Sequence, residues 1–483
     1  MASRPRPSWG SGESWSAGAR VKVRMYRGLL GDCFLLRFRR RGGDAFVLVD
    51  CGMFLGMQDE VAHMRAIVAD IARACGSHLD VVVITHEHWD HICGFLHAAD
   101  LFDQIRIDTL WLAWTEDPDD GDARALRAAH RAALALLEAA APRIAHGEVL
   151  ESVIGFFGAA AAGQARSGTI IEAMKGRADT VRYLSPGQAP LELAGVEDLC
   201  VHVLGPPRDR RLLRRSDPTR RGGEVYEFAG GADGDRRFLA AGLTADEAHA
   251  EAVEAAMPFD RKHRTDLSAL GRKPSAAAPE WIAGLAATYG DDDAAWRRVD
   301  GDWLSAFEAL ALRLDSDTNN TSLALAFAFG MAQGAEGDVL LFPGDAQVGN
   351  WLSWGDYHAP AAPQGQAVTR DRLLARTVLY KVGHHCSHNA TLRAEGLEKM
   401  TRPDLVAMVP VQEDFARRVR AWNMPFPALY DRLLQQCGGN VLRSDRSAAA
   451  MRTAKAKLDF ARPSAVFDAA EDAADGLYVE VTF

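Results

Sequence analysis

One short segment of this chain concentrates the residue types that bind metal ions. It follows an apolar run at 81–84 and holds His86, Glu87, His88, Asp90 and His91. Side chains alternate between the two faces of a strand, so His86 and His88 project the same way and could hold one ion together. If a helix begins at Trp89, Asp90 and His91 return from the other side and could hold a second ion. Imidazole and carboxylate donors suit zinc, manganese or iron, and no cysteine pair is near for a closed structural zinc site.

The spacing His86-x-His88-x-Asp90-His91 resembles the H-x-H-x-D-H signature of metallo-β-lactamase-fold hydrolases. Further apolar runs end in residues that resemble the other motifs of this family, upstream in Asp50-Cys51-Gly52 and downstream in Gly344-Asp345 and His384-His385. The resemblance implies that Asp50 orients the metal ligands by hydrogen bonding and that Asp345 bridges two ions.

The paired histidines leave two assignments open. Adjacent strand residues point to opposite faces unless the chain turns between them. We expect His385 to bind metal and His384 to contact the leaving group or the scissile phosphate, with Ser387 as a supporting hydroxyl donor. The exchange of these roles is the alternative. His202 lies inside its apolar run, so we expect it in the core or on a sheet face, and the first ion would be completed by water or substrate.

The stretch from Lys381 to Ser387 is similar to the soluble hydrolase domain of ComEC-type competence proteins and their stand-alone relatives. Gly31-Asp32 and residues 319–325 and 425–445 also resemble parts of that domain. The resemblance implies an α/β (α+β) fold, a four-layer αββα metallo-β-lactamase sandwich. Two mixed sheets would pack face to face, helices would cover both outsides, and loops at one sheet edge would gather the ligands.

The chain is longer than this domain requires. Of its 483 residues, we expect 1–20 to form a flexible tail and 21–483 the hydrolase domain. The motifs leave gaps at about 116–179 and 208–315, rich in helix-forming residues, which we expect to be mainly helical insertions. Asp122 is the expected N-cap of a helix over 123–141. A basic run at 208–215 stands out against a net charge of −10 and could attract phosphate if it borders the site.

Composition indicates a cytoplasmic protein. No apolar run reaches the roughly 20 residues of a membrane helix, and the first twenty residues lack the apolar core of a signal peptide. The seven cysteines include no Cys-x-x-Cys pair and are expected to be reduced thiols. No phosphate-binding glycine loop or serine nucleophile elbow is present in the sequence.

These observations predict a metal-dependent hydrolase in which a hydroxide bridged by two divalent ions attacks the substrate. Zinc is the first expectation and manganese the second. One ion would be held by His86, His88 and Asp345. The ligands of the other would be Asp90, His91, Asp345 and His385, and the expected catalytic residues are Asp90 and His384.

The ComEC-type resemblance implies a phosphodiester substrate such as DNA, RNA or a nucleotide, and hence a phosphodiesterase or nuclease. One alternative is carboxylic ester or lactone hydrolysis, and another is an inactive binding or scaffold protein on a hydrolase fold. Two settings fit equally: housekeeping nucleic-acid processing, and an effector that protein partners regulate. Neither the oligomeric state nor the exact substrate follows from the sequence.

Overall fold

The computed structural model describes most of the chain in eight stretches and four single positions. The described residues are 15, 18–140, 157, 167–216, 281, 288, 302–330, 337–359, 367–420, 422–457, 471–472 and 476–483. The predicted tail, 1–20, therefore lies largely outside the described residues. So do large parts of both predicted insertions.

The first sheet has eight strands. In spatial order they are β15 (Glu471–Asp472), β16 (Tyr478–Thr482), β1 (Val21–Tyr26), β2 (Cys33–Arg40), β3 (Gly43–Cys51), β4 (His78–Val83), β5 (Arg106–Ala113) and β6 (Ala178–Leu184). Pairing is antiparallel from β15 to β3 and parallel from β3 to β6. Side chains along a strand alternate between the two faces of the sheet, and both faces are covered. In β3, Val47 and Val49 face one apolar cluster, and Phe46 and Leu48 face another.

The second sheet has six strands. Their spatial order is β14 (Val441–Arg443), β13 (Val406–Val409), β12 (Thr377–Lys381), β9 (Val339–Phe342), β8 (Ala324–Phe329) and β7 (Leu199–Gly205). Strands β7, β8 and β9 pair antiparallel, and β9, β12, β13 and β14 pair parallel. A separate two-stranded ladder joins β10 (His358–Ala359) and β11 (Val368–Thr369).

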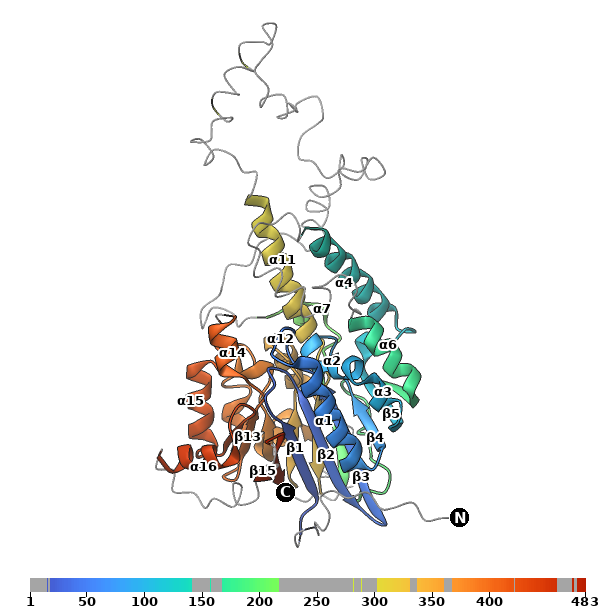
Figure 1. The fold of residues 1–483 in the computed structure, drawn as a ribbon, viewed down its shortest axis with the longest axis vertical. Coiled ribbons are helices and arrows are strands. Elements are labelled where there is room, and N and C mark those ends of the chain that lie inside the picture. The colour runs from blue at the N-terminus through green and yellow to red at the C-terminus, as the bar shows by residue number, and fades with distance from the viewer. Residues whose placement is uncertain are drawn as a thin grey trace. The chain divides into compact units, whose positions relative to one another are not determined.

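Helices cover the outer face of each sheet (Figure 1). On the first sheet lie α1 (Glu60–Cys75), α2 (Trp89–His97), α3 (Ala99–Phe102) and α6 (Ser167–Arg177). The second sheet is associated with α12 (Val348–Ser353), α13 (Arg370–Ala375), α14 (Glu413–Arg418), α15 (Pro427–Gln436) and α16 (Ala448–Lys457). The main core lies between the sheets, where Phe38 stacks on Phe327 at 5.7 Å. The predicted four-layer αββα sandwich is therefore confirmed.

The chain divides into two compact units. The sandwich belongs to the first, which comprises 1–128, 155–225 and 315–483. The second comprises 129–154 and 226–314, and its longer described helical parts belong to α4 (Gly121–Ala140) and α11 (Asp302–Asn319). The expected helix over 123–141 is present as α4, but Asp122 is not its cap. Asp120 Oδ1 instead accepts hydrogen bonds from the backbone N–H groups of Asp122 and Ala123.

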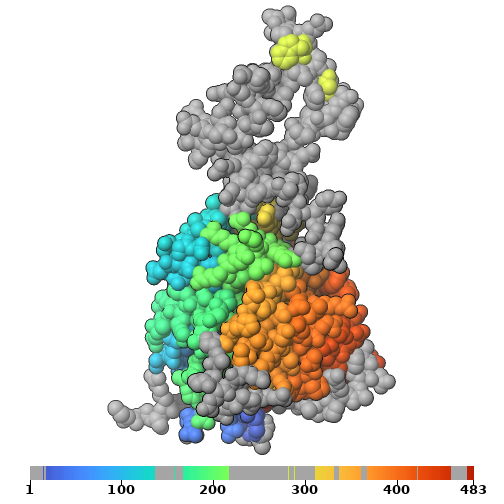
Figure 2. Space-filling model, turned by 180° about the vertical axis from the view of Figure 1, so that it is seen from behind, coloured from blue at the N-terminus to red at the C-terminus, as the bar shows by residue number. Residues whose placement is uncertain are grey.

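The short helix α7 (Arg210–Leu213) packs against α12, and the N–H of Gly349 donates to the carbonyl oxygen of Arg215. Figure 2 shows this contact region from behind, where the green surface of the chain borders the orange surface. Among the described residues, no helix has the length and apolar character to cross a membrane. None of the seven cysteines forms a disulfide.

A close backbone approach joins β3 to the start of α2. A Cβ atom on Gly52 would lie 2.3 Å from the carbonyl carbon of Asp90 and 2.5 Å from the backbone nitrogen of His91. Both neighbours are backbone atoms, which cannot rotate away. The glycine of the Asp50-x-Gly52 motif therefore allows α2 to bring Asp90 and His91 to the end of β3.

We expect Gly52→Ala to lower the free energy of unfolding by about 1–3 kcal/mol, because α2 must move away from β3 to admit the methyl group. Urea denaturation followed by circular dichroism measures the change. Gly168→Ala in α6 is the matched control, since its added Cβ would meet no atom within 4 Å and alanine favours helix. Equal stability of Gly52→Ala and the wild-type chain would contradict this explanation.

Candidate metal centre

The metal-binding residue types gather where strands of both sheets end. Asp50 is the second-to-last residue of β3, His86 and His88 follow β4, Asp345 follows β9, and His385 follows β12. Strand β3 pairs parallel with β4, and β9 pairs parallel with β12, so the carboxyl ends of each pair lie at the same edge of its sheet. The helix α2 begins at Trp89, as expected, and adds Asp90 and His91 from its first turn.

Four of the predicted ligands form one buried group, namely Asp90, His91, Asp345 and His385, each with a ligand atom within 4.8 Å of the others. His385 Nε2 lies 2.8 Å from Asp90 Oδ2 and 3.8 Å from Asp345 Oδ2. His91 Nε2 lies 3.2 Å from the same Asp345 oxygen. The structure thus brings together the complete set predicted for the second ion.

The hydrogen bonds of His91 and His385 indicate that this group of ligands suits a bound cation. His91 Nδ1 lies 2.8 Å from Asp50 Oδ2, and His385 Nδ1 lies 2.8 Å from the carbonyl oxygen of Pro410. Both partners accept hydrogen bonds, so each Nδ1 carries a proton and donates it. Each Nε2 then directs a lone pair toward carboxylate oxygens, and that arrangement requires a bound cation or an additional proton between them.

Unsatisfied atoms point to the same conclusion. Asp90 Oδ1 and His91 Nε2 are buried and make no hydrogen bond to another described residue. Buried polar atoms without partners are rare and costly. Imidazole nitrogens and carboxylate oxygens at this spacing therefore fit a divalent metal ion.

His86 and His88 form a second pair of ligand atoms. Thr85 Oγ1 donates to Asp50 Oδ2 at 2.7 Å and lies 3.0 Å from His86 Nδ1, so it accepts the His86 proton. His86 Nε2 is then free of hydrogen and lies 3.0 Å from His88 Nδ1. Burial lowers the pKa of His86 well below its usual range and that of His88 to about 3. Both imidazoles are therefore neutral, as metal ligands must be.

Asp345 belongs to the four-residue group. Among the described residues, its ligand atoms do not lie within 4.8 Å of those of both His86 and His88, the other ligands predicted for the first ion. Its Oδ1 accepts from Lys381 Nζ at 3.1 Å and from the backbone N–H of His384 at 2.9 Å. Burial alone would raise the pKa of Asp345, but the charges of Lys381 and His91 outweigh it and hold that pKa well below the usual range. Oδ2 remains for the histidines.

Lys381 is a site residue that the sequence reasoning missed. Its buried ammonium contacts Asp32, Asp345 and the carbonyl oxygen of Gly344. Burial outweighs the lysine charge at Asp32 and raises the pKa of that carboxyl to about 6. The sequence feature that could have indicated this role is a lysine at the end of an otherwise apolar strand. A charged side chain is rarely buried unless it is paired, so such a lysine predicts a buried carboxylate partner.

Asp315, near the end of α11, was also missed. Its Oδ1 lies 3.6 Å from His88 Nε2, while Oδ2 accepts a 3.4 Å hydrogen bond from Asn319. Burial, followed by the charges of Asp90 and Asp345, raises the pKa of Asp315 to about 8. Its sequence position lies at the edge of a predicted helical insertion. Nothing there marks this aspartate as different from its neighbours.

The structure separates His202 from the other predicted residues. It lies on β7, and its Nδ1 is 2.8 Å from the hydroxyl oxygen of Tyr357. This placement agrees with the expectation of a sheet-face residue. His384 Nδ1 lies 2.9 Å from Ser387 Oγ, so the predicted catalytic histidine and its predicted supporting hydroxyl contact each other beside the metal centre rather than within its ligand group.

Other charged features have internal partners. In the basic run, Arg208 and Arg210 pair with Asp120 and Asp122, and the Arg208 guanidinium lies 4.0 Å from the centroid of the Trp114 ring. Glu60 Oε1 accepts from Trp89 Nε1 and His97 Nε2, both at 2.8 Å, so the group it forms with Cys93 is satisfied without an ion.

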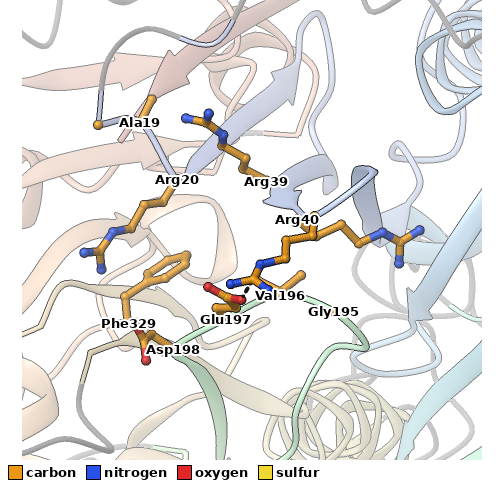
Figure 3. A pocket seen from close by; sticks show the side chains of 11 residues that line it. Ala19, Arg20, Arg39, Arg40, Gly195, Val196, Glu197, Asp198 and Phe329 are labelled. Carbon is orange, nitrogen blue, oxygen red and sulfur yellow. Dashed lines mark ion pairs between the residues drawn. The ribbon is translucent and has the colours of Figure 1, made fainter.

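A cavity of about 420 Å³ lies at the opposite ends of the strands (Figure 3). Its lining includes Arg20, Arg39, Arg40, Glu197 and Phe329, and it contains no histidine or cysteine. An ion pair neutralises part of the positive charge of its lining, since Arg40 pairs with Asp80 at 2.7 Å. None of the predicted site residues lines this cavity.

Comparison with known families agrees with the geometry. Residues 26–151 match the metallo-beta-lactamase superfamily. The matched segment carries Asp50 and the residues from His86 to His91, whereas Asp345 and His385 lie beyond it. No curated protein matches the chain.

Removal of the buried lysine should destabilise the domain. We expect Lys381→Met to lower the free energy of unfolding of the metal-free protein by about 3–5 kcal/mol at pH 7, because Asp32 and Asp345 lose their common cation. The pKa of Asp32, already raised by burial, would rise further, and that of Asp345 would rise above its unfolded value. The penalty should therefore grow from pH 5 to pH 7, as the carboxyls are forced to ionise. Chemical denaturation at both pH values measures it.

Lys399→Met is the control for this prediction, since Lys399 forms a surface ion pair with Asp371 at 3.0 Å. Such pairs contribute little, and we expect a change within about 1 kcal/mol at either pH. If Lys381→Met were as mild as this control, Lys381 would not compensate the buried carboxylates.

Proposed function

We propose that this protein is a metal-dependent hydrolase. The observation that carries the proposal is the convergence of Asp90, His91, Asp345 and His385, four buried ligands whose atoms lie within 4.8 Å of one another. The match of residues 26–151 to the metallo-beta-lactamase superfamily supports it, because members of that superfamily are generally hydrolases. An inactive scaffold would have no physical need to keep these uncompensated acceptor atoms buried together.

Two divalent ions bound here would supply Lewis acidity and a water of lowered pKa as the nucleophile. We propose zinc as the first choice for these ions and manganese as the second. His86 Nε2 and His88 Nδ1 would hold one ion, and the group of Asp90, His91, Asp345 and His385 the other. Oδ2 of Asp345 is the oxygen available for a bridge, since Oδ1 is held by Lys381 and the His384 backbone. Asp50 fixes His91 through its 2.8 Å hydrogen bond and holds Thr85, which in turn fixes His86.

For the substrate we propose a phosphodiester, such as DNA, RNA or a nucleotide. The support is the similarity of residues 381–387 to ComEC-type hydrolase domains. The structure adds a physical reason for the lysine in that stretch, because Lys381 balances the carboxylates beside the reaction site. Partner proteins that regulate the activity remain part of the proposal.

Metal content tests the centre directly. We expect the wild-type chain to bind divalent ions, and Asp90→Ala to lose at least one ion per chain and about 10³-fold or more of its turnover, because one ligand oxygen is removed. Elemental analysis and a hydrolysis assay measure the two effects. His388→Ala is the control, since this exposed histidine lies three residues after His385 and should leave both values unchanged. A wild-type protein without bound metal or turnover would favour the scaffold interpretation.

A pair of chromogenic substrates tests the reaction class. We expect faster turnover of bis-p-nitrophenyl phosphate than of p-nitrophenyl acetate after correction for the uncatalysed rates, and loss of both activities in excess chelator. The phosphorus and carbonyl centres share the leaving group, so the comparison isolates the centre that is attacked. Preference for the acetate would instead indicate carboxylic ester or lactone hydrolysis.

A further inference from the structure

His384 stands beside the metal centre in an unusual turn. The residues His384, His385 and Cys386 have φ angles of 42°, 50° and 64°, a left-handed conformation that side chains other than glycine rarely adopt. The turn is held by the backbone N–H of His384, which donates to Asp345 Oδ1 at 2.9 Å. Such strain is retained when it serves to place a side chain. Here it separates the directions of His384 and His385.

A chain of hydrogen bonds determines which nitrogen of His384 carries the proton. Asn389 Nδ2 donates to the carbonyl oxygen of Ser216 at 3.4 Å, which fixes the orientation of its amide and turns Oδ1 toward Ser387. Ser387 Oγ donates its one proton to this Oδ1 at 2.8 Å. The 2.9 Å contact between Ser387 Oγ and His384 Nδ1 must therefore be a hydrogen bond that the histidine donates.

Gln347 provides the other contact of the same nitrogen. Its amide nitrogen lies 3.4 Å from His384 Nδ1, and its Oε1 is buried without a hydrogen bond to any described residue. Rotation of this amide by about 180° exchanges two atoms of equal size and brings the oxygen to Nδ1. The oxygen then accepts from the same N–H and is satisfied. With its amide in that orientation, Gln347 is compatible with the proton on Nδ1 that the Ser387 contact requires.

We infer that Ser387 and Asn389 hold neutral His384 in the Nδ1–H form, so that its Nε2 is a hydrogen-bond acceptor for an O–H group of the substrate or of the attacking water. Ser387 and Asn389 are positioning residues in this arrangement. A neutral His384 cannot then donate a hydrogen bond from Nε2 to a leaving oxygen. Stabilisation of that oxygen falls to other groups of the centre.

This assignment follows the same rule as at His86, His91 and His385. In each case an oxygen atom accepts the Nδ1 proton and leaves Nε2 free. At His384, as at His86, the acceptor is a hydroxyl whose own proton goes to a third residue, so the orientation depends on two residues. The inference rests on the proposed hydrolase function for its role in catalysis, but the tautomer itself can be measured without turnover.

Nitrogen-15 NMR of the full-length, zinc-loaded chain tests the tautomer. Two-bond hydrogen–nitrogen correlations distinguish Nδ1–H from Nε2–H imidazoles, and His384→Gln identifies the signal of His384 by its loss. We expect Nδ1–H in the wild type, an increased share of Nε2–H in Ser387→Ala, and a wild-type spectrum in Ser387→Thr, which keeps the hydroxyl. A proton on Nε2 in the wild type, or no difference between Ser387→Ala and Ser387→Thr, overturns the inference.

Kinetics identify the donor that Nε2 serves. We expect Ser387→Ala to reduce kcat by about tenfold or more, with recovery in Ser387→Thr. If the donor is a substrate hydroxyl, the loss should be confined to an RNA dinucleotide and absent from its DNA counterpart. If the donor is the attacking water, both should lose alike. An unchanged kcat for both in Ser387→Ala contradicts the role, whereas a metal-free and inactive wild type contradicts the proposed function and leaves the NMR result standing.

Discussion

The charge on Asp345 is the constraint on which the rest of the centre depends. A carboxylate this deeply buried is stable only beside compensating cations and donors. Lys381 and the backbone of His384 occupy one oxygen, and the other faces His91 and His385. The same contacts hold β9 against β12 and maintain the left-handed turn that separates the two histidines. Sheet pairing and ligand placement are therefore parts of one arrangement.

The histidines of the centre are oriented by acceptors on Nδ1. Asp50 serves His91 directly and reaches His86 through Thr85, so one carboxylate at the end of β3 orients ligands for both expected ions. A neutral imidazole has one proton and one lone pair, and the partner of one nitrogen decides the function of the other. This rule explains why a hydroxyl or carbonyl oxygen lies at hydrogen-bond distance from Nδ1 of His86 and of His385.

The fold brings these groups together through close backbone contacts rather than through long side chains. Gly52 lets α2 begin against the end of β3, and Asp32 donates its backbone N–H to the carbonyl oxygen of Asp90 at 3.0 Å. Asp32 also contacts Lys381 from the other sheet. The two halves of the sandwich are joined at the centre by this buried ion pair and by the backbone N–H of Leu323, which donates to the carbonyl oxygen of Thr85 at 2.9 Å, in addition to their apolar core.

From the sequence alone came the start of α2 at Trp89 and the candidate ligands at strand ends, because strand alternation and the spacing of His86 to His91 are local properties. The layered fold followed from the family resemblance that these motifs carry. The sequence also separated His202 from the strand-end residues. The roles of Lys381, Asp32 and Asp315 depended on tertiary structure, since their partners are far away in the chain and a buried charge has no local signature. The cap at Asp120 and the proton on His384 were likewise decided by contacts in space. Hydrogen-bond direction is a property of the assembled network, which no single stretch of sequence contains.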